Sequence, residues 1–207
     1  MEIKTAPLGN MAANFYIVTD EVTNEMFVVD PGDCPEIACD LIKSTGMSLK
    51  YIFITHAHAD HIGALDALKN QFDAPVVIYS DEADALNDTN ATLCNVFSFP
   101  APITKADIKV TEQSCLPFGN TKITFIHTPG HTKGSMCIKL DNVLFSGDTL
   151  FELSVGRCDF PGGDFFEIEN SIKNKLYSLP PETKVYPGHG NPTTVGFEKE
   201  NNPFVRG

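Results

Sequence analysis

Three of the six histidines of this chain stand within one six-residue segment. His56, His58 and His61, together with Asp60, form the segment His-Ala-His-Ala-Asp-His. Neutral imidazole nitrogens and ionised carboxylate oxygens are ligands that zinc and similar divalent ions accept at about 2.0–2.2 Å. The alternative is that Asp60 only caps a helix and that the histidines lie on the surface. So many possible ligands in one short segment favour a metal site.

The elements around this segment should point its side chains towards one place. The apolar run Tyr51–Thr55 predicts a buried strand, and the first two histidines follow it in extended chain, so both face the same way. Apolar residues at helical spacing over Ile62–Lys69 predict a helix with Asp60 and His61 at or just inside its N-terminus. One loop can therefore offer ligands to two neighbouring ions.

Three more polar residues each follow an apolar, strand-like run. The residues are His131, Asp148 and His189, and the runs before them are Ile123–Ile126, Val143–Phe145 and Lys184–Tyr186. Each run ends in a turn that contains glycine, which lets the backbone bend and present a side chain. We expect these three residues to gather at one rim of the protein.

The order of these residues resembles the metallo-β-lactamase superfamily, whose signature is His-x-His-x-Asp-His followed by a distant His, Asp and His. The resemblance extends from the turn Val29–Gly32 to His189, and the segments Thr128–Thr132 and Ser146–Phe151 are similar to short, single-domain glyoxalase II (hydroxyacylglutathione hydrolase) enzymes. It implies an α/β fold, a four-layer αβ/βα sandwich of two mixed β-sheets flanked by helices. Residues 1–207 would form one such domain.

The resemblance also implies a ligand set and a reaction. The first metal would be held by His56, His58 and His131, the second by Asp60, His61 and His189, and Asp148 would bridge them. Two divalent ions are expected, with zinc first and iron or manganese as alternatives. A bridging hydroxide would cleave a thioester or ester such as S-D-lactoylglutathione, while Asp60 orients the attacking water and can accept its proton. Many true β-lactamases of the superfamily have cysteine at the place of Asp148, which counts against an antibiotic-hydrolysing role.

Substrate binding is predicted from one basic residue. Arg157 lies in Gly156–Phe160, where glyoxalase II enzymes place a residue that contacts the glutathione carboxylate, so we predict that it clamps an anion. The alternative is an ion pair within the loop. The chain ends soon after His189 without the C-terminal helical domain of the longer enzymes, and it lacks their tyrosine after the last ligand. Glutathione is therefore one candidate thiol among several.

A second enzyme class remains open because persulfide dioxygenases share a Gly-Arg-x-Asp-Phe stretch like Gly156–Phe160. They resemble glyoxalase II but use a single iron, which here would be held by His56, His131 and Asp148. A scaffold that binds metal without catalysis is a third reading, which the complete ligand set opposes.

Four further residues have two readings each. We interpret His127, four residues before the distant ligand, as a turn residue rather than another ligand. Asp30 either accepts a hydrogen bond from a ligand imidazole or only shapes a turn. Phe97 and Phe99 either form a flap over the site or anchor a loop.

The net charge and the composition of the chain limit the kinds of partner that we expect. The net charge of −12 argues against nucleic acid, so a small-molecule substrate is expected. The N-terminus does not resemble a signal peptide and no apolar run reaches transmembrane length, which predicts a cytoplasmic protein without a membrane partner. Six cysteines without CxxC spacing predict free thiols. The oligomeric state is left open.

The first half of the chain predicts a regular order of elements before the metal segment. The predicted strands are Ile3–Pro7, Asn14–Thr19 and Met26–Asp30, and the predicted helix is Pro35–Thr45. A second half of the same type follows.

Overall fold

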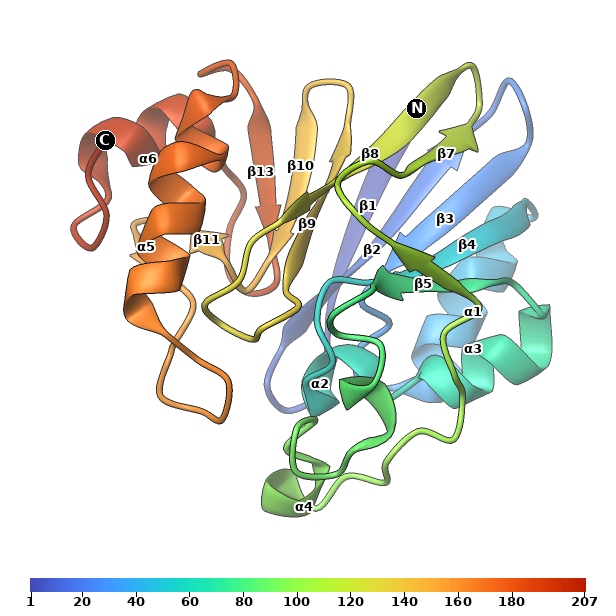
Figure 1. The fold of residues 1–207 in the computed structure, drawn as a ribbon. Coiled ribbons are helices and arrows are strands. Elements are labelled where there is room, and N and C mark those ends of the chain that lie inside the picture. Colours follow the sequence, from blue (N-terminus) through green and yellow to red (C-terminus); the bar gives the residue numbers. More distant parts are fainter.

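The computed structural model describes residues 1–207 and contains two six-stranded sheets packed face to face (Figure 1). The first sheet contains, in spatial order, β1 (Glu2–Leu8), β2 (Ala13–Asp20), β3 (Glu25–Val29), β4 (Ser48–Ile54), β5 (Val76–Tyr79) and β6 (Ile108–Val110). The second contains β14 (Thr193–Thr194), β13 (Lys184–Pro187), β10 (Val143–Gly147), β9 (Met136–Leu140), β8 (Thr121–His127) and β7 (Cys115–Phe118). A small hairpin joins β11 (Leu150–Phe151) to β12 (Ser154–Val155).

Helices cover the outer face of each sheet. The α-helices of the chain are α1 (Pro35–Thr45), α2 (Ala59–Ile62), α3 (Leu65–Phe72), α4 (Cys94–Phe97), α5 (Phe165–Asn174) and α6 (Val195–Asn201), of which α2 and α4 are single turns in the segments that follow β4 and β5. There are 3₁₀ turns at Ala85–Asn87 and Leu176–Ser178. In Figure 1, α1 and α3 lie against the first sheet, and α5 and α6 lie beside the second. Both sheets contain parallel and antiparallel pairs. The predicted four-layer αβ/βα sandwich of mixed sheets is therefore confirmed.

Alternating side chains explain why the central strands are buried on both faces. In β3, Met26 and Val28 pack against the helices, whereas Phe27 packs between the two sheets. The same alternation holds in β4, where Ile52 faces the helices and Phe53 faces the other sheet. Successive side chains of a strand point to opposite faces, so an uninterrupted apolar run is needed wherever both faces are covered.

The predicted helix Pro35–Thr45 begins and ends where expected, with proline in its first turn and Gly46 in the left-handed conformation (φ 67°) after its end. The predicted helix Ile62–Lys69 is wrong as a single element. It is broken after α2 because the amide of Ala64 donates to the carbonyl of Gly32 at 2.7 Å instead of continuing the helical ladder.

Smaller differences occur elsewhere. The strand predicted as Met26–Asp30 ends one residue earlier, because Asp30 adopts the left-handed conformation (φ 49°). All six cysteines are free thiols, and three of them are buried. None of the helices combines the length and the apolar character needed to cross a bilayer.

Candidate metal centre

Four strand ends bring the predicted ligands to one edge of the sandwich. The segment that begins at His56 follows β4 of the first sheet, whereas His131, Asp148 and His189 follow β8, β10 and β13 of the second. The first sheet also holds the last of these turns, because Tyr16 in β2 donates its hydroxyl to the carbonyl of Pro187 at 2.6 Å. The site therefore lies where the two sheets meet.

Three imidazoles form one group of candidate ligands, which we call the three-histidine group: His56, His58 and His131. Nε2 of His131 lies 3.2 Å from Nε2 of His56 and 2.8 Å from Nδ1 of His58. All three side chains are buried. Three ring nitrogens thus converge on a volume that water scarcely reaches.

Asp60, His61 and His189 form a second group, which we call the mixed group. Oδ2 of Asp60 lies 3.6 Å from Nε2 of His61 and 3.2 Å from Nε2 of His189. A glycine must stand at 188, since a Cβ there would lie 2.1 Å from Oδ1 of Asp148. That close approach explains the Pro-Gly-His turn.

Asp148 lies between the two groups. Its Oδ1 is 3.5 Å from Nε2 of His61, and its Oδ2 is 3.5 Å from Nε2 of His131 and 3.7 Å from Nε2 of His189. One carboxylate therefore faces both groups, which is the placement that a bridging ligand needs. All seven residues singled out as ligands in the sequence lie together in the structure.

Hydrogen bonds behind the ligands fix which ring nitrogen faces the site. Nδ1 of His61 donates to Oδ2 of Asp30 at 2.9 Å, and Nδ1 of His131 donates to the carbonyl of Arg157 at 2.7 Å. The hydroxyl of Thr55 donates to Asp30 at 2.6 Å and lies 3.1 Å from Nδ1 of His56, from which it accepts. With the protons held at Nδ1, the Nε2 lone pairs of these histidines face the site. Asp30 thus supports a ligand imidazole as well as shaping its turn.

The buried atoms left without partners test whether these residues fit a metal. Nε2 of His61 and Oδ1 of Asp148 are buried and have no hydrogen-bond partner. Leaving such groups unpaired costs about 1–3 kcal/mol each. Ring nitrogens and carboxylate oxygens that face one another around one small volume are satisfied by a cation, so the donor set fits divalent metal ions.

Protonation differs between the two groups when no metal is bound. Burial, together with the facing His131 and His61, lowers the pKa of His58 to about 3. Burial also opposes a charge on His61, but Asp60, Asp148 and Asp30 outweigh it and raise its pKa to about 10. At pH 7 His58 therefore offers a lone pair directly, whereas His61 must release a proton to bind a metal.

A cavity of about 330 Å³ opens beside the ligands. Its apolar wall consists of Met11, Leu93, Phe97, Phe151, Val155 and Phe160. Of these, only Phe97 was singled out in the sequence, and Phe99 is not among the lining residues. Phe151 and Phe160 end the segments Ser146–Phe151 and Gly156–Phe160 that carry the family resemblance, but nothing in the sequence marked Met11, Leu93 or Val155 as part of a cavity wall.

Arg157 lines the same cavity and is already paired. Its Nε and Nη2 donate to the two carboxylate oxygens of Asp159 at 2.7 and 2.6 Å, and its guanidinium lies 3.9 Å from the ring centre of Phe160. The structure therefore contains the ion pair of the alternative reading and also places Arg157 at the cavity beside the candidate ligands.

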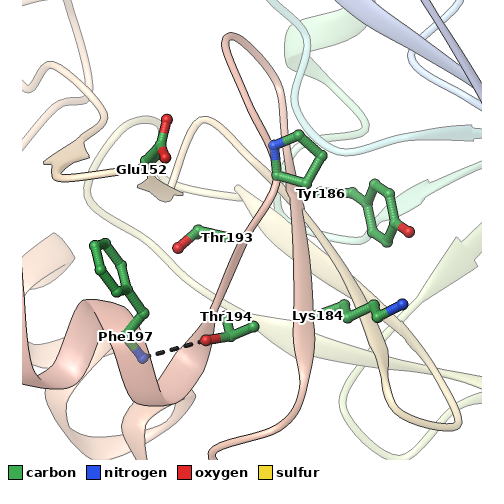
Figure 2. A pocket seen from close by; sticks show the side chains of 7 residues that line it. Glu152, Lys184, Tyr186, Thr193, Thr194 and Phe197 are labelled. Atoms are coloured by element: carbon green, nitrogen blue, oxygen red, sulfur yellow. Dashed lines mark hydrogen bonds between the residues drawn. The ribbon is translucent and has the colours of Figure 1, made fainter.

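His127 lies outside both ligand groups, as expected. Its ring stacks on Tyr79 with 4.3 Å between ring centres, and its Nε2 donates to the carbonyl of Lys133 at 2.9 Å. A larger hollow of about 450 Å³ lies at β13, β14 and α6, where Thr194 caps the helix by accepting from the amide of Phe197 (Figure 2). No candidate ligand lines that hollow, so it is separate from the metal centre.

Sequence reasoning missed Glu82. It stands in the acidic stretch Ser80–Asp84, which reads as a solvated loop, yet its side chain is buried against the metal-binding loops. Nothing in the local pattern separates it from the exposed acids on either side.

The chain is similar to a known family and to known proteins over nearly its whole length. A family model described as the metallo-beta-lactamase superfamily matches residues 8–189. The chain is 33% identical to the probable metallo-hydrolase YqgX of Bacillus subtilis, over 100% of this chain and 99% of that protein. It is 30% identical to the hydroxyacylglutathione hydrolase GloC of Haemophilus influenzae, over 99% and 98% of the two chains.

Three solved structures are similar over nearly all of this chain. BLEG-1, described as a B3 metallo-beta-lactamase, is 37% identical with a TM-score of 0.93 and full coverage of both chains. TTHA1623 in a di-iron-bound form is 35% identical with a TM-score of 0.87, covering 98% of this chain and 100% of the other. ETHE1 from Myxococcus xanthus is 28% identical with a TM-score of 0.82, covering 98% and 84%.

Proposed function

Because this chain belongs to the metallo-β-lactamase superfamily, we propose that it is a binuclear metallohydrolase of the glyoxalase II type, acting on a small-molecule thioester or ester. The observation that carries the proposal is Asp148, whose two carboxylate oxygens face the three-histidine group and the mixed group at about the same distance. The 30% identity with a hydroxyacylglutathione hydrolase gives distant support for the substrate class.

The three-histidine group would hold one divalent ion and the mixed group the other, with Asp148 shared between them. Zinc is the expected ion, and iron is an alternative because a 35% identical structure is described as di-iron-bound. When bound, two such ions lower the pKa of a shared water towards about 7 and polarise the substrate carbonyl. No side-chain nucleophile is then needed.

Asp60 has a second role in this proposal, beside its place in the mixed group. Burial alone would raise the pKa of Asp60, but His61 and the hydrogen bond from His189 outweigh it and hold the carboxylate below its usual range. Asp60 therefore stays ionised, and its oxygens can accept a hydrogen bond from the attacking water and orient it. Its low basicity favours orientation over full proton transfer.

We propose that Arg157 contacts an anionic part of the substrate at the mouth of the cavity. Both oxygens of Asp159 occupy Nε and Nη2 of Arg157 in the structure, so a substrate carboxylate that binds this edge of the guanidinium displaces Asp159. Asp159→Asn would leave the guanidinium less occupied and should lower KM for a substrate carrying a carboxylate, whereas Arg157→Ala should raise it. An uncharged thioester with the same acyl group is the control, and its KM should not move.

Hydrolysis of S-D-lactoylglutathione by metal-loaded protein is the direct test. Turnover near about 10 s⁻¹, the median of known enzymes, would support a glyoxalase II-type thioesterase. Protein with two metals per chain but no turnover of any thioester or ester would contradict the proposal. A β-lactam belongs among the substrates assayed, because a 37% identical structure is described as a metallo-beta-lactamase.

A second candidate is an oxidoreductase that uses a single iron to oxidise a persulfide. The observation in its favour is that His56, His131 and Asp148 are close enough to share one ion, with 3.2 Å and 3.5 Å from Nε2 of His131 to the other two. Metal analysis separates the candidates: two ions per chain favours the hydrolase, and one iron with oxygen uptake on a persulfide favours the oxidoreductase.

A further inference from the structure

A buried carboxylate outside the ligand set joins the two loops that carry the three-histidine group. Glu82 follows β5 in the first sheet and is 3% exposed. Its Oε1 accepts from the amide of Ala57 at 2.9 Å, and its Oε2 accepts from the hydroxyl of Thr132 at 2.9 Å and from the amide of Gly134 at 3.0 Å. All three donors belong to metal-binding loops.

These donors stand directly beside the candidate ligands. Ala57 lies between His56 and His58, and Thr132 follows His131. The two loops come from different sheets and are 75 residues apart in the chain, measured from His56 to His131. Glu82 therefore fixes the backbone on both sides of the same volume.

The geometry of the three imidazoles depends on the two loops, because Nε2 of His131 lies 2.8 Å from Nδ1 of His58 and 3.2 Å from Nε2 of His56 only while the loops stay together. A clamp outside the ligand set keeps the loops together and reduces the ordering that metal binding must impose. One backbone bond, from the amide of Met136 to the carbonyl of Thr55 at 3.0 Å, also joins these segments. It lies outside the loops, whereas the contacts of Glu82 lie within them.

The loop that follows His131 packs closely against the Glu82 carboxylate and backbone. A Cβ at residue 134 would lie 2.3 Å from the amide nitrogen of Glu82, so glycine is required where the second loop crosses it. The hydroxyl of Thr132 is also held at 2.7 Å from the hydroxyl of Ser135, which restricts its rotation. The loop that follows His131 is thus shaped around the carboxylate.

We propose that Glu82 is a positioning residue that preorganises the three-histidine group for metal binding. The inference rests on the metal centre of the proposed function but not on its substrate. It predicts a selective effect: loss of the clamp should weaken the three-histidine group and leave the mixed group unchanged.

Glu82→Gln tests the proposal with little change in shape. The amide keeps one acceptor oxygen and places an NH₂ group against donors, so a loop amide at Ala57 or Gly134 loses its partner. Metal-free protein is titrated with Zn²⁺ against a competing chelator, and with Co²⁺ to follow the absorption of each bound ion. We expect one of the two binding steps to weaken by about 10-fold, the lower end of the range seen when a partner of the ligand itself is lost, because Glu82 bonds the residues beside the ligands.

Glu198→Gln is the matched control. Glu198 is 0% exposed and also accepts three hydrogen bonds, from the amide of Leu153 at 2.9 Å, the amide group of Asn202 at 2.8 Å and the hydroxyl of Thr193 at 2.7 Å. None of these donors adjoins a candidate ligand in the chain. This variant should lower the melting temperature of metal-free protein but leave both binding steps unchanged.

Each outcome decides the inference. A weakened step in Glu82→Gln alone supports it. Wild-type affinity in Glu82→Gln, or equal weakening in Glu198→Gln, overturns it and leaves Glu82 as an ordinary buried acid. If the wild-type protein takes up no metal, the proposed function fails together with the inference. Should Glu82→Gln not fold, Thr132→Val removes a single donor to the same carboxylate, and unchanged affinity there also overturns the inference.

Discussion

Replacing Asp30 by asparagine should weaken the mixed group while the fold survives. Asp30 is 1% exposed, and its Oδ2 accepts from Nδ1 of His61 and from the hydroxyl of Thr55, while its Oδ1 accepts from the amide of Thr55 at 2.8 Å. Asparagine has nearly the same shape but only one acceptor oxygen. If its NH₂ group faces His61, it donates to Nδ1 and moves the imidazole proton to Nε2, which then faces the metal position. The wrong tautomer cannot bind a metal there.

The size of the effect follows from one lost hydrogen bond to a charged acceptor. Such bonds contribute about 1.5–3 kcal/mol when buried. At about 1.4 kcal/mol per tenfold change, this corresponds to about 10- to 150-fold weaker metal binding. The range agrees with the ~10- to 100-fold usually lost with a partner behind a metal ligand.

The assay is a zinc titration of metal-free protein against a competing chelator, with urea unfolding of the same samples. Asp66→Asn is the control, because Asp66 accepts hydrogen bonds from two backbone amides, those of Ile103 at 3.0 Å and Thr104 at 2.9 Å, but contacts no candidate ligand. Only Asp30→Asn should lose affinity. Two zinc equivalents bound with wild-type affinity in Asp30→Asn would refute the reasoning, as would an equal loss in Asp66→Asn.

Three further predictions follow from the site. Asp148→Ala should leave fewer than two metals per chain and lower kcat/KM by more than ~100-fold, because both ligand groups face this carboxylate. Elemental analysis and thioester kinetics check this prediction, and full activity would contradict the bridging role of Asp148. Metal-free protein should lose stability as pH falls below about 6.5, because His58 is protonated near that value in the unfolded chain, whereas its pKa in the folded protein is about 3. The expected loss in the free energy of unfolding from pH 6.5 to 5 is on the order of 2 kcal/mol, and urea unfolding should show a flatter pH dependence in His58→Asn. Phe97→Ala should raise KM by about fivefold through the loss of ~1 kcal/mol of apolar contact, while Phe99→Ala should not change it; equal KM values in both variants would remove Phe97 from the binding surface.

Local sequence patterns were sufficient to predict the structure where a residue's role depends on its neighbours in the chain. The alternation in β3 and β4 follows from the two-residue period of a strand, and the ends of α1 follow from Pro35 and Gly46. The ligand segment could be interpreted for the same reason, since closely spaced histidines leaving one strand must share a site. These features are present in the folded protein because the packing of the sheets and helices requires them.

Patterns failed where a distant segment competed for the same backbone or side chain. The helix expected over Ile62–Lys69 has the right apolar spacing, but the turn at Gly32 captures the amide of Ala64 and breaks it. Arg157 could be placed at the cavity, yet its partner Asp159 and its stacking on Phe160 depend on the loop's folded shape. Periodicity carries no information about such encounters.

The sequence by itself determined the types and the order of the candidate ligands, and through its resemblance to a known superfamily it predicted the two-sheet sandwich that carries them. Only the tertiary structure decided which side chains stand behind the ligands. Glu82 reaches Ala57 across 25 residues and Thr132 across 50, and Asp30 reaches His61 across 31. Such contacts exist only after the sheets have packed and withdrawn water from the site, so that a buried donor must find its acceptor wherever the fold brings one.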